Sequence, residues 1–126
     1  MKRLIAAILM LVISIGIGIT SLVCVRKNCN EAIQGLEGIL QNAVTENKEE
    51  VNRLAVQVNE QWEKEKFLMN ILIGQGQTNE IKKKLDIIIY FTQIRDYESV
   101  ILFSEECKGD LMNIIVSNEP NLSTIL

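Results

Sequence analysis

One uncharged stretch near the start of the chain limits what the whole sequence can fold into. Residues 4–25 read LIAAILMLVISIGIGITSLVCV, twenty-two positions without a charged side chain, and they lie between Lys2 and Arg3 on one side and Arg26 and Lys27 on the other. An α-helix rises about 1.5 Å per residue, so this stretch would be about 33 Å long, and the hydrocarbon core of a bilayer is about 30 Å thick. The sequence therefore predicts a transmembrane helix over residues 4–25, after a short tail of residues 1–3.

Two other interpretations of this stretch fit less well. A cleaved signal peptide has an apolar region of about 7 to 15 residues that ends in a small-x-small site. Residues 21–24, Ser-Leu-Val-Cys, do not have that pattern, and Val23 before Cys24 also argues against a lipoprotein signal. A buried helix of a soluble domain would need more surrounding chain than the remaining residues supply. We therefore expect an uncleaved membrane anchor.

The charges that flank the span are nearly balanced, so they decide little about its orientation. Lys2, Arg3 and the terminal amine precede it, and Arg26 and Lys27 follow it. A very short tail followed by a large polar part is the usual arrangement of a signal anchor. We therefore expect the N-terminus in the cytoplasm and the part after the span outside the cell membrane.

Small side chains recur along one face of the predicted span. Ala7, Ser14, Gly18 and Ser21 follow one another at intervals of seven, four and three positions, which places them on one side of a helix. Such a face lets another membrane helix approach closely. It is a candidate packing face for another membrane protein or a second copy of this chain, although small residues are also common in membrane helices for no such reason.

The composition of the chain makes several classes of partner and site unexpected. The chain has a formal net charge of −3 and no histidine. The acidic part after the span lacks a broad basic face with interleaved aromatic residues, so nucleic acid is not an expected partner. Without histidine or a C-x-x-C pattern no metal site is expected, and no motif indicates a cofactor. Cys24 lies in the span, and for Cys29 and Cys107 we favour buried free thiols over a disulfide.

Beyond the span, apolar residues recur every three to four positions in four stretches, as in amphipathic helices. The stretches cover residues 28–44, 48–73, 79–95 and 97–117. The fold class that we predict is all-α: an N-terminal transmembrane helix followed by a small antiparallel four-helix bundle over residues 28–119. We expect residues 120–126 to be a C-terminal tail that begins with the only proline, Pro120.

Three features inside these helices bear on packing. Trp62 lies on the apolar side of the second helix, so we expect it in the core. The third helix starts with three lysines, Lys82 to Lys84, which we interpret as a solvated turn, and then becomes almost wholly apolar. Its DIIIYFTQI segment also suits a β-strand, but no second strand is available to pair with it.

Capping residues and glycines predict where the helices begin and end. Asn47 with Glu50 three positions later predicts a capping box at the start of the second helix. Thr78 and Asp96 are the predicted N-caps of the third and fourth helices.

Two glycines close together, Gly74 and Gly76, predict a left-handed exit and a flexible loop over residues 74–77. The same residues lack the third glycine, the preceding strand and the lysine of a phosphate-binding loop, so that interpretation is set aside.

Four segments carry a likeness to a known family. They are the start MKRLIAAILMLVISIGIGITSLVCV, the stretch NKEEVNRLAVQVNEQWEKEKFLMNILI with Trp62, the segment IRDYESVILFSEECKGDLMNII and the end NLSTIL. In these the chain resembles the DUF4363 family of small proteins from clostridia and their relatives. The loop over residues 74–79 departs from the acidic, often histidine-containing connection expected there. The resemblance implies a membrane-anchored helical protein and brings no catalytic residue with it.

These features favour a non-catalytic interaction module or an accessory subunit of a membrane complex. A sensor or ligand-binding domain outside the membrane is the alternative, although only three residues precede the span. An enzyme is least favoured, because histidine is absent and no nucleophile lies in a recognisable turn. The carboxylate pairs Glu49–Glu50 and Glu105–Glu106 fit a helix start and a solvated face.

Overall fold

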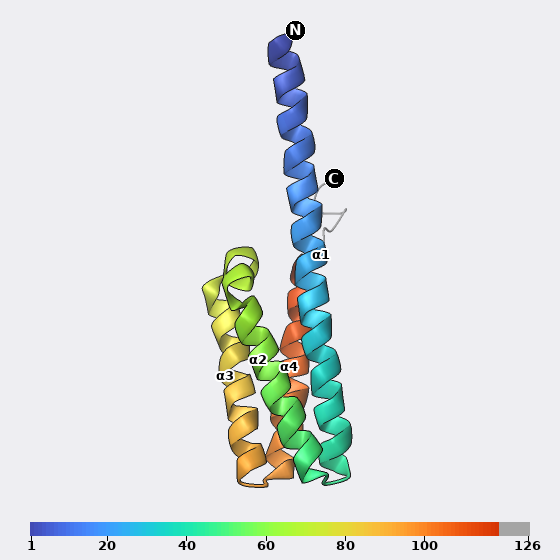
Figure 1. Cartoon of the computed structure of the whole chain (residues 1–126), viewed down its shortest axis with the longest axis vertical. Helices are drawn as coiled ribbons and strands as arrows, with labels where there is room; N and C mark the ends of the chain where they lie inside the picture. The colour runs from blue at the N-terminus through green and yellow to red at the C-terminus, as the bar shows by residue number, and fades with distance from the viewer. Residues whose placement is uncertain (119–126) are drawn as a thin grey trace.

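The computed structural model describes residues 1–118 and folds them into four α-helices: α1 (Lys2–Val44), α2 (Lys48–Ile73), α3 (Gln75–Gln93) and α4 (Tyr97–Asn118). Successive helices pack antiparallel, and α4 closes the bundle by packing against α1 (Figure 1). The N-terminal half of α1 projects beyond the other three helices. The predicted all-α, antiparallel four-helix arrangement is confirmed, and the predicted span is not a separate helix but the first part of α1. Residues 119–126, and with them the predicted tail, lie outside the described residues.

A repeat in the buried positions explains why the helices pack side by side. Core residues in each helix are spaced alternately by four and three positions, which keeps one face toward the neighbours along the whole length. In α1 these residues are Val25, Cys29, Ala32, Leu36, Ile39 and Ala43. In α4 they are Val100, Ser104, Cys107, Leu111 and Ile114. Trp62 of α2 belongs to the same core and is only 1% exposed, as predicted.

Two glycines of α1 set how closely α1 and α2 approach. A Cβ atom on Gly35 would lie 2.2 Å from Cγ2 of Val58, and one on Gly38 would lie 3.2 Å from Cδ1 of Leu54. Any larger side chain at Gly35 would therefore push the two helices apart. In spite of these glycines, α1 runs unbroken from the projecting half into the bundle.

The turn between α1 and α2 differs from the prediction in its hydrogen bonds. Asn47 is the N-cap of α2, as predicted, but its side chain makes no capping hydrogen bond. The prediction of a capping box is therefore wrong. The Glu50 carboxylate instead accepts two hydrogen bonds from the Arg53 guanidinium, at 3.0 and 2.7 Å. The backbone closes the turn: the Asn47 amide donates to the Asn42 carbonyl at 3.0 Å, next to Glu46 at a φ of 56°.

The connection between α2 and α3 is one residue, not the flexible loop predicted over residues 74–77. Gly74, at a φ of 94°, ends α2 and begins α3. This left-handed conformation suits glycine and reverses the chain at once, so Gln75, Gly76 and Gln77 are already helical. Thr78 is consequently not the N-cap that we predicted. It lies in the first turn, fully buried, and its hydroxyl donates to the Gly74 carbonyl at 2.9 Å.

The start of α4, after the turn from α3, is capped as predicted. The Asp96 carboxylate accepts a hydrogen bond from the Ser99 amide at 3.2 Å, which is the predicted N-cap of α4. The DIIIYFTQI segment is helical throughout residues 86–93, so the strand alternative is wrong. Ile88 and Leu85 of this helix are buried, whereas Tyr90 lies on its exposed side.

Candidate functional site

The projecting half of α1 is the first candidate. All of residues 1–20 are exposed, and within residues 1–118 this is the one helix long and apolar enough to cross a membrane. A signal sequence near the N-terminus would meet the same criteria of length and composition. The structure therefore supports a candidate membrane helix at the N-terminus.

The small-residue face lies open on this half. Ala7, Ser14 and Gly18 are exposed, and Ser21 is partly covered at the edge of the bundle. The Ser14 hydroxyl donates to the Met10 carbonyl and the Ser21 hydroxyl to the Ile17 carbonyl, both at 2.8 Å. A Cβ atom on Gly18 would meet nothing within 4 Å. Because the hydroxyls are satisfied within the helix, this face needs no polar partner in lipid.

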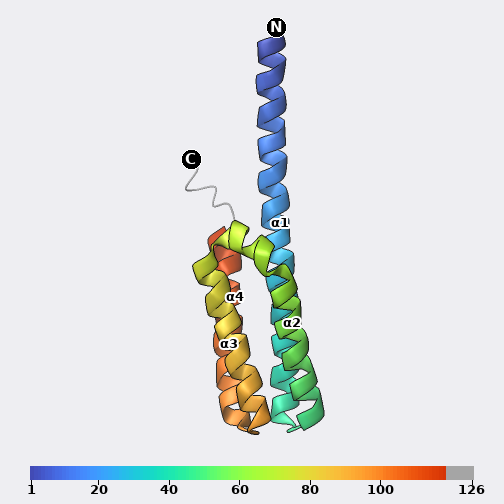
Figure 2. The same ribbon diagram turned by 60° about the vertical axis from the view of Figure 1, so that its left-hand side comes forward.

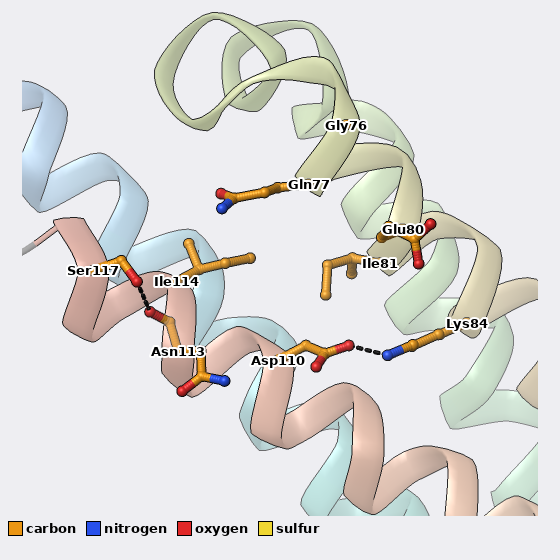
Figure 3. A pocket seen from close by; sticks show the side chains of 9 residues that line it. All are labelled: Gly76, Gln77, Glu80, Ile81, Lys84, Asp110, Asn113, Ile114 and Ser117. Carbon is orange, nitrogen blue, oxygen red and sulfur yellow. Dashed lines mark hydrogen bonds and ion pairs between the residues drawn. The ribbon is translucent and has the colours of Figure 1, made fainter.

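A second candidate is a pocket of about 410 Å³ between α3 and α4 (Figure 3). Ile81 from α3 and Ile114 from α4 extend into the space between the helices, and the Gln77 side chain reaches from α3 toward α4. Asn113 and Ser117 line the α4 side. The pocket is thus apolar at its centre and carries polar groups at its edge, among them the charged side chains of Glu80, Lys84 and Asp110.

Lys84 lies at one end of this pocket, and its positive charge is balanced by two carboxylates. Its ammonium hydrogen-bonds the Asp110 carboxylate and lies 3.2 Å from Oε1 of Glu106. The hydrogen bond to Asp110 raises the pKa of Lys84. A lysine held in its protonated form is neither a nucleophile nor a base, and the contacts of this group join α3 to α4.

Lys82 makes the corresponding link from α3 to α2. Its ammonium hydrogen-bonds the Asn59 side chain and lies 3.3 Å from Oε2 of Glu63. The prediction that all three lysines form a solvated turn is therefore wrong for two of them. Lys82 and Lys84 lie on the two sides of the buried stripe that contains Leu85, so their long stems run along the core edge while the charges reach partners on the adjacent helices.

A carboxylate that was not predicted from the sequence lies within the core stripe of α2. Glu65 lies between Trp62 and Met69, at the position where the four-and-three spacing calls for a core residue. Its Oε1 accepts a hydrogen bond from Gln61 at 2.8 Å, and its Oε2 is buried. Burial raises the pKa of Glu65, and the nearby Glu31 carboxylate acts in the same direction, while Gln61 and Lys27 oppose it. The spacing of the apolar stripe was the signal that could have located this residue.

The buried thiols of Cys29 and Cys107 are held in their protonated, unreactive form. Burial, with a smaller contribution from Glu65, raises the pKa of Cys29 to about 11, and burial raises that of Cys107 to about 12. Both therefore stay protonated near neutral pH. All three cysteines, each within the described part of the chain, are free, as we favoured.

No group of three or more histidine, cysteine or acidic side chains within residues 1–118 is placed to hold a metal ion. The comparisons with known proteins add no relative: no family model, no curated protein and no solved structure matches this chain.

Proposed function

We propose that this protein is a single-pass membrane protein whose helical bundle is a non-catalytic interaction module or an accessory subunit of a membrane complex. The observation that carries the proposal is the continuity of α1, whose apolar projecting half and core-forming half are one helix without a linker. A rigid connection of this kind fixes both the height and the rotation of the bundle relative to the span. That suits a protein that holds a set position in an assembly.

The chemistry of the bundle supports a non-catalytic role. Several groups that could react are engaged or buried: Lys84 by Asp110 and Glu106, and the thiols of Cys29 and Cys107 by the core. The resemblance to the DUF4363 family points to the same membrane-anchored helical architecture.

We further propose that the partner is met in the membrane, along Ala7, Ser14, Gly18 and Ser21. Lipid gives apolar helices no hydrophobic reason to associate, so close backbone approach over small residues is a main source of attraction. The partner is another membrane helix, either from a larger membrane protein or from a second copy of this chain.

The test is a double variant, Ser14→Leu with Gly18→Leu, compared with the unchanged chain by crosslinking in native membranes. We expect the crosslinked species to be lost, because two leucines fill the groove that a neighbour would occupy. Val12→Leu with Ile19→Leu is the matched control, since these positions lie on the opposite side of the helix. Crosslinks that survive the first pair of changes would refute the packing face.

The orientation proposed for the span has its own test. Glu105 is exposed on α4, so a Glu105→Cys variant should react with a membrane-impermeant thiol reagent in intact cells if the bundle lies outside. Reaction only after lysis would place the bundle in the cytoplasm. The parent chain measures any background from the native thiols.

A further inference from the structure

At one end of the bundle, three chain segments without charged side chains lie at the same height. Residues 67–79, which include the α2–α3 turn, and residues 111–118 at the end of α4 contain no charge, as is also true of residues 4–25. We call residues 67–79 and 111–118 the uncharged end. Figures 1 and 2 show the α2–α3 turn and the end of α4 at one level, beside the middle of α1. The opposite end of the bundle carries Glu46, Lys48, Arg95 and Asp96.

Contacts between α1 and α2 fix how far the uncharged end reaches along the span. Gln61 hydrogen-bonds Glu31 at 3.4 Å, and Gly35 and Gly38 face Val58 and Leu54. The two helices are antiparallel and have the same rise, so Phe67 lies about level with residue 25 or 26, and Ile71 about level with residue 21 or 22. The burial of α1 agrees, because Ser21 is the first of its residues to be partly covered.

The freely projecting part of α1 contains only part of the uncharged run of residues 4–25. Its exposed apolar run is residues 4–20, which as a helix is about 26 Å long, against a hydrocarbon core of about 30 Å. Residues 21–25 complete the span, and these are the residues beside the uncharged end. If the whole run of residues 4–25 lies in the hydrocarbon, the boundary of the hydrocarbon reaches the uncharged end.

The side chains at this end suit lipid. Phe67 is 79% exposed, Ile71 66% and Val116 70%, so large apolar side chains of both α2 and α4 face outward at this level. Directly below them the helices carry charges again, among them Lys27 and Lys66, whose ammonium groups can reach the phosphates of the headgroups.

We propose that the uncharged end is a lipid-contacting surface, seated at the boundary between headgroups and hydrocarbon, with Phe67 and Ile71 against the acyl chains. This inference rests on the proposed membrane anchor and adds a second contact with the bilayer. It commits to lipid as the occupant because the surface is continuous with the span and stops where the charges begin. The bundle then stands upright with its end in the membrane surface.

The test uses the full chain in phosphatidylcholine vesicles, with Cys24→Ser to remove the one partly exposed thiol. Single cysteines are introduced and labelled with an environment-sensitive dye at four positions: Phe67 and Ile71 in the uncharged end, Leu11 in the projecting helix and Glu60 in α2. Glu60 is the matched control, because seven residues are about two helical turns and place it on the same face as Phe67, further from the membrane. The Cys24→Ser parent measures labelling of Cys29 and Cys107.

We expect lipids that carry a nitroxide near the headgroup to quench the dye at positions 67 and 71. Lipids with a nitroxide near the end of the acyl chain should quench it at position 11, and neither should quench it at position 60. Quenching at 11 without quenching at 67 and 71 would overturn the lipid-contacting surface and leave the anchor standing. Loss of quenching at 11 would overturn the anchor itself. Equal quenching at 60 and 67 would overturn the upright seating.

Discussion

At the scale of single residues, the least expected feature is a carboxylate in a core position. Glu65 takes the place of an apolar residue between Trp62 and Met69, close to Cys29 and to the Glu31 carboxylate. Burial raises its pKa, so its charged form favours the unfolded chain. The protein keeps this residue at a cost in stability that a neutral side chain of the same shape would avoid.

We expect Glu65→Gln to stabilise the bundle at neutral pH, because glutamine removes the buried charge and can still accept the hydrogen bond from Gln61. The sign follows from linkage: a carboxyl group whose pKa is raised by folding destabilises the folded state above that pKa, and the penalty disappears as the pH falls through it toward the usual value. The gain from the substitution should therefore be present at about pH 7 and fade by about pH 4.

Thermal unfolding of the full chain in detergent, followed by circular dichroism, measures this effect. Glu60→Gln is the control, because Glu60 is an exposed glutamate on the same helix. A gain that stays constant between the two pH values would show that charge burial at Glu65 is not its cause.

At the scale of helices, the close approach of α1 and α2 depends on Gly35. Adding a Cβ atom there places it 2.2 Å from Cγ2 of Val58, and valine is a stiff side chain that cannot turn away easily. The two helices must shift, although alanine is the better helix former by about 1 kcal/mol.

We therefore expect Gly35→Ala to destabilise the bundle, with an overpacking cost of about 1 to 3 kcal/mol that outweighs the helix-propensity gain. Chemical unfolding of the full chain in detergent gives the free-energy change. Gly109→Ala is the matched control, because a Cβ atom there meets nothing within 4 Å, and that variant should be slightly more stable than the parent. Combining Gly35→Ala with Val58→Ala should restore part of the loss; a loss of the same size in both backgrounds would show that the contact with Val58 is not responsible.

The helices themselves could be predicted from the sequence, and their connections only in part. Periodic apolar residues identify four helices because burial of one face is a property of the local pattern. The Asp96 cap is equally local. The single-residue turn at Gly74 could not be predicted in this way, because a glycine that reverses the chain and one that opens a loop look alike until the helices on both sides are packed. The solvated turn predicted for Lys82 and Lys84 was wrong for the same reason, since their partners on α2 and α4 are distant in sequence.

At the scale of the whole molecule, two structural properties combine. The long first helix is shared between the candidate span and the bundle core, and the uncharged end of the bundle lies beside the last turns of the apolar run. The small-residue face could be located from the sequence, whereas the proposed lipid-contacting surface could not, because it is assembled from two separate segments whose height relative to the span only the packing defines.

If α1 spans the membrane as we propose, its unbroken course also couples the tilt of the span to the position of the bundle. The portion of this helix within the bundle, from residue 25 to its last residue, Val44, is about 29 Å long. Transmembrane helices lean by about 20° on average and change their tilt with bilayer thickness. A tilt of that size would carry the far end of the bundle sideways by about 10 Å. A small change in the lipid, or in a helix that packs against the span, would thereby become a large displacement at the surface furthest from the membrane.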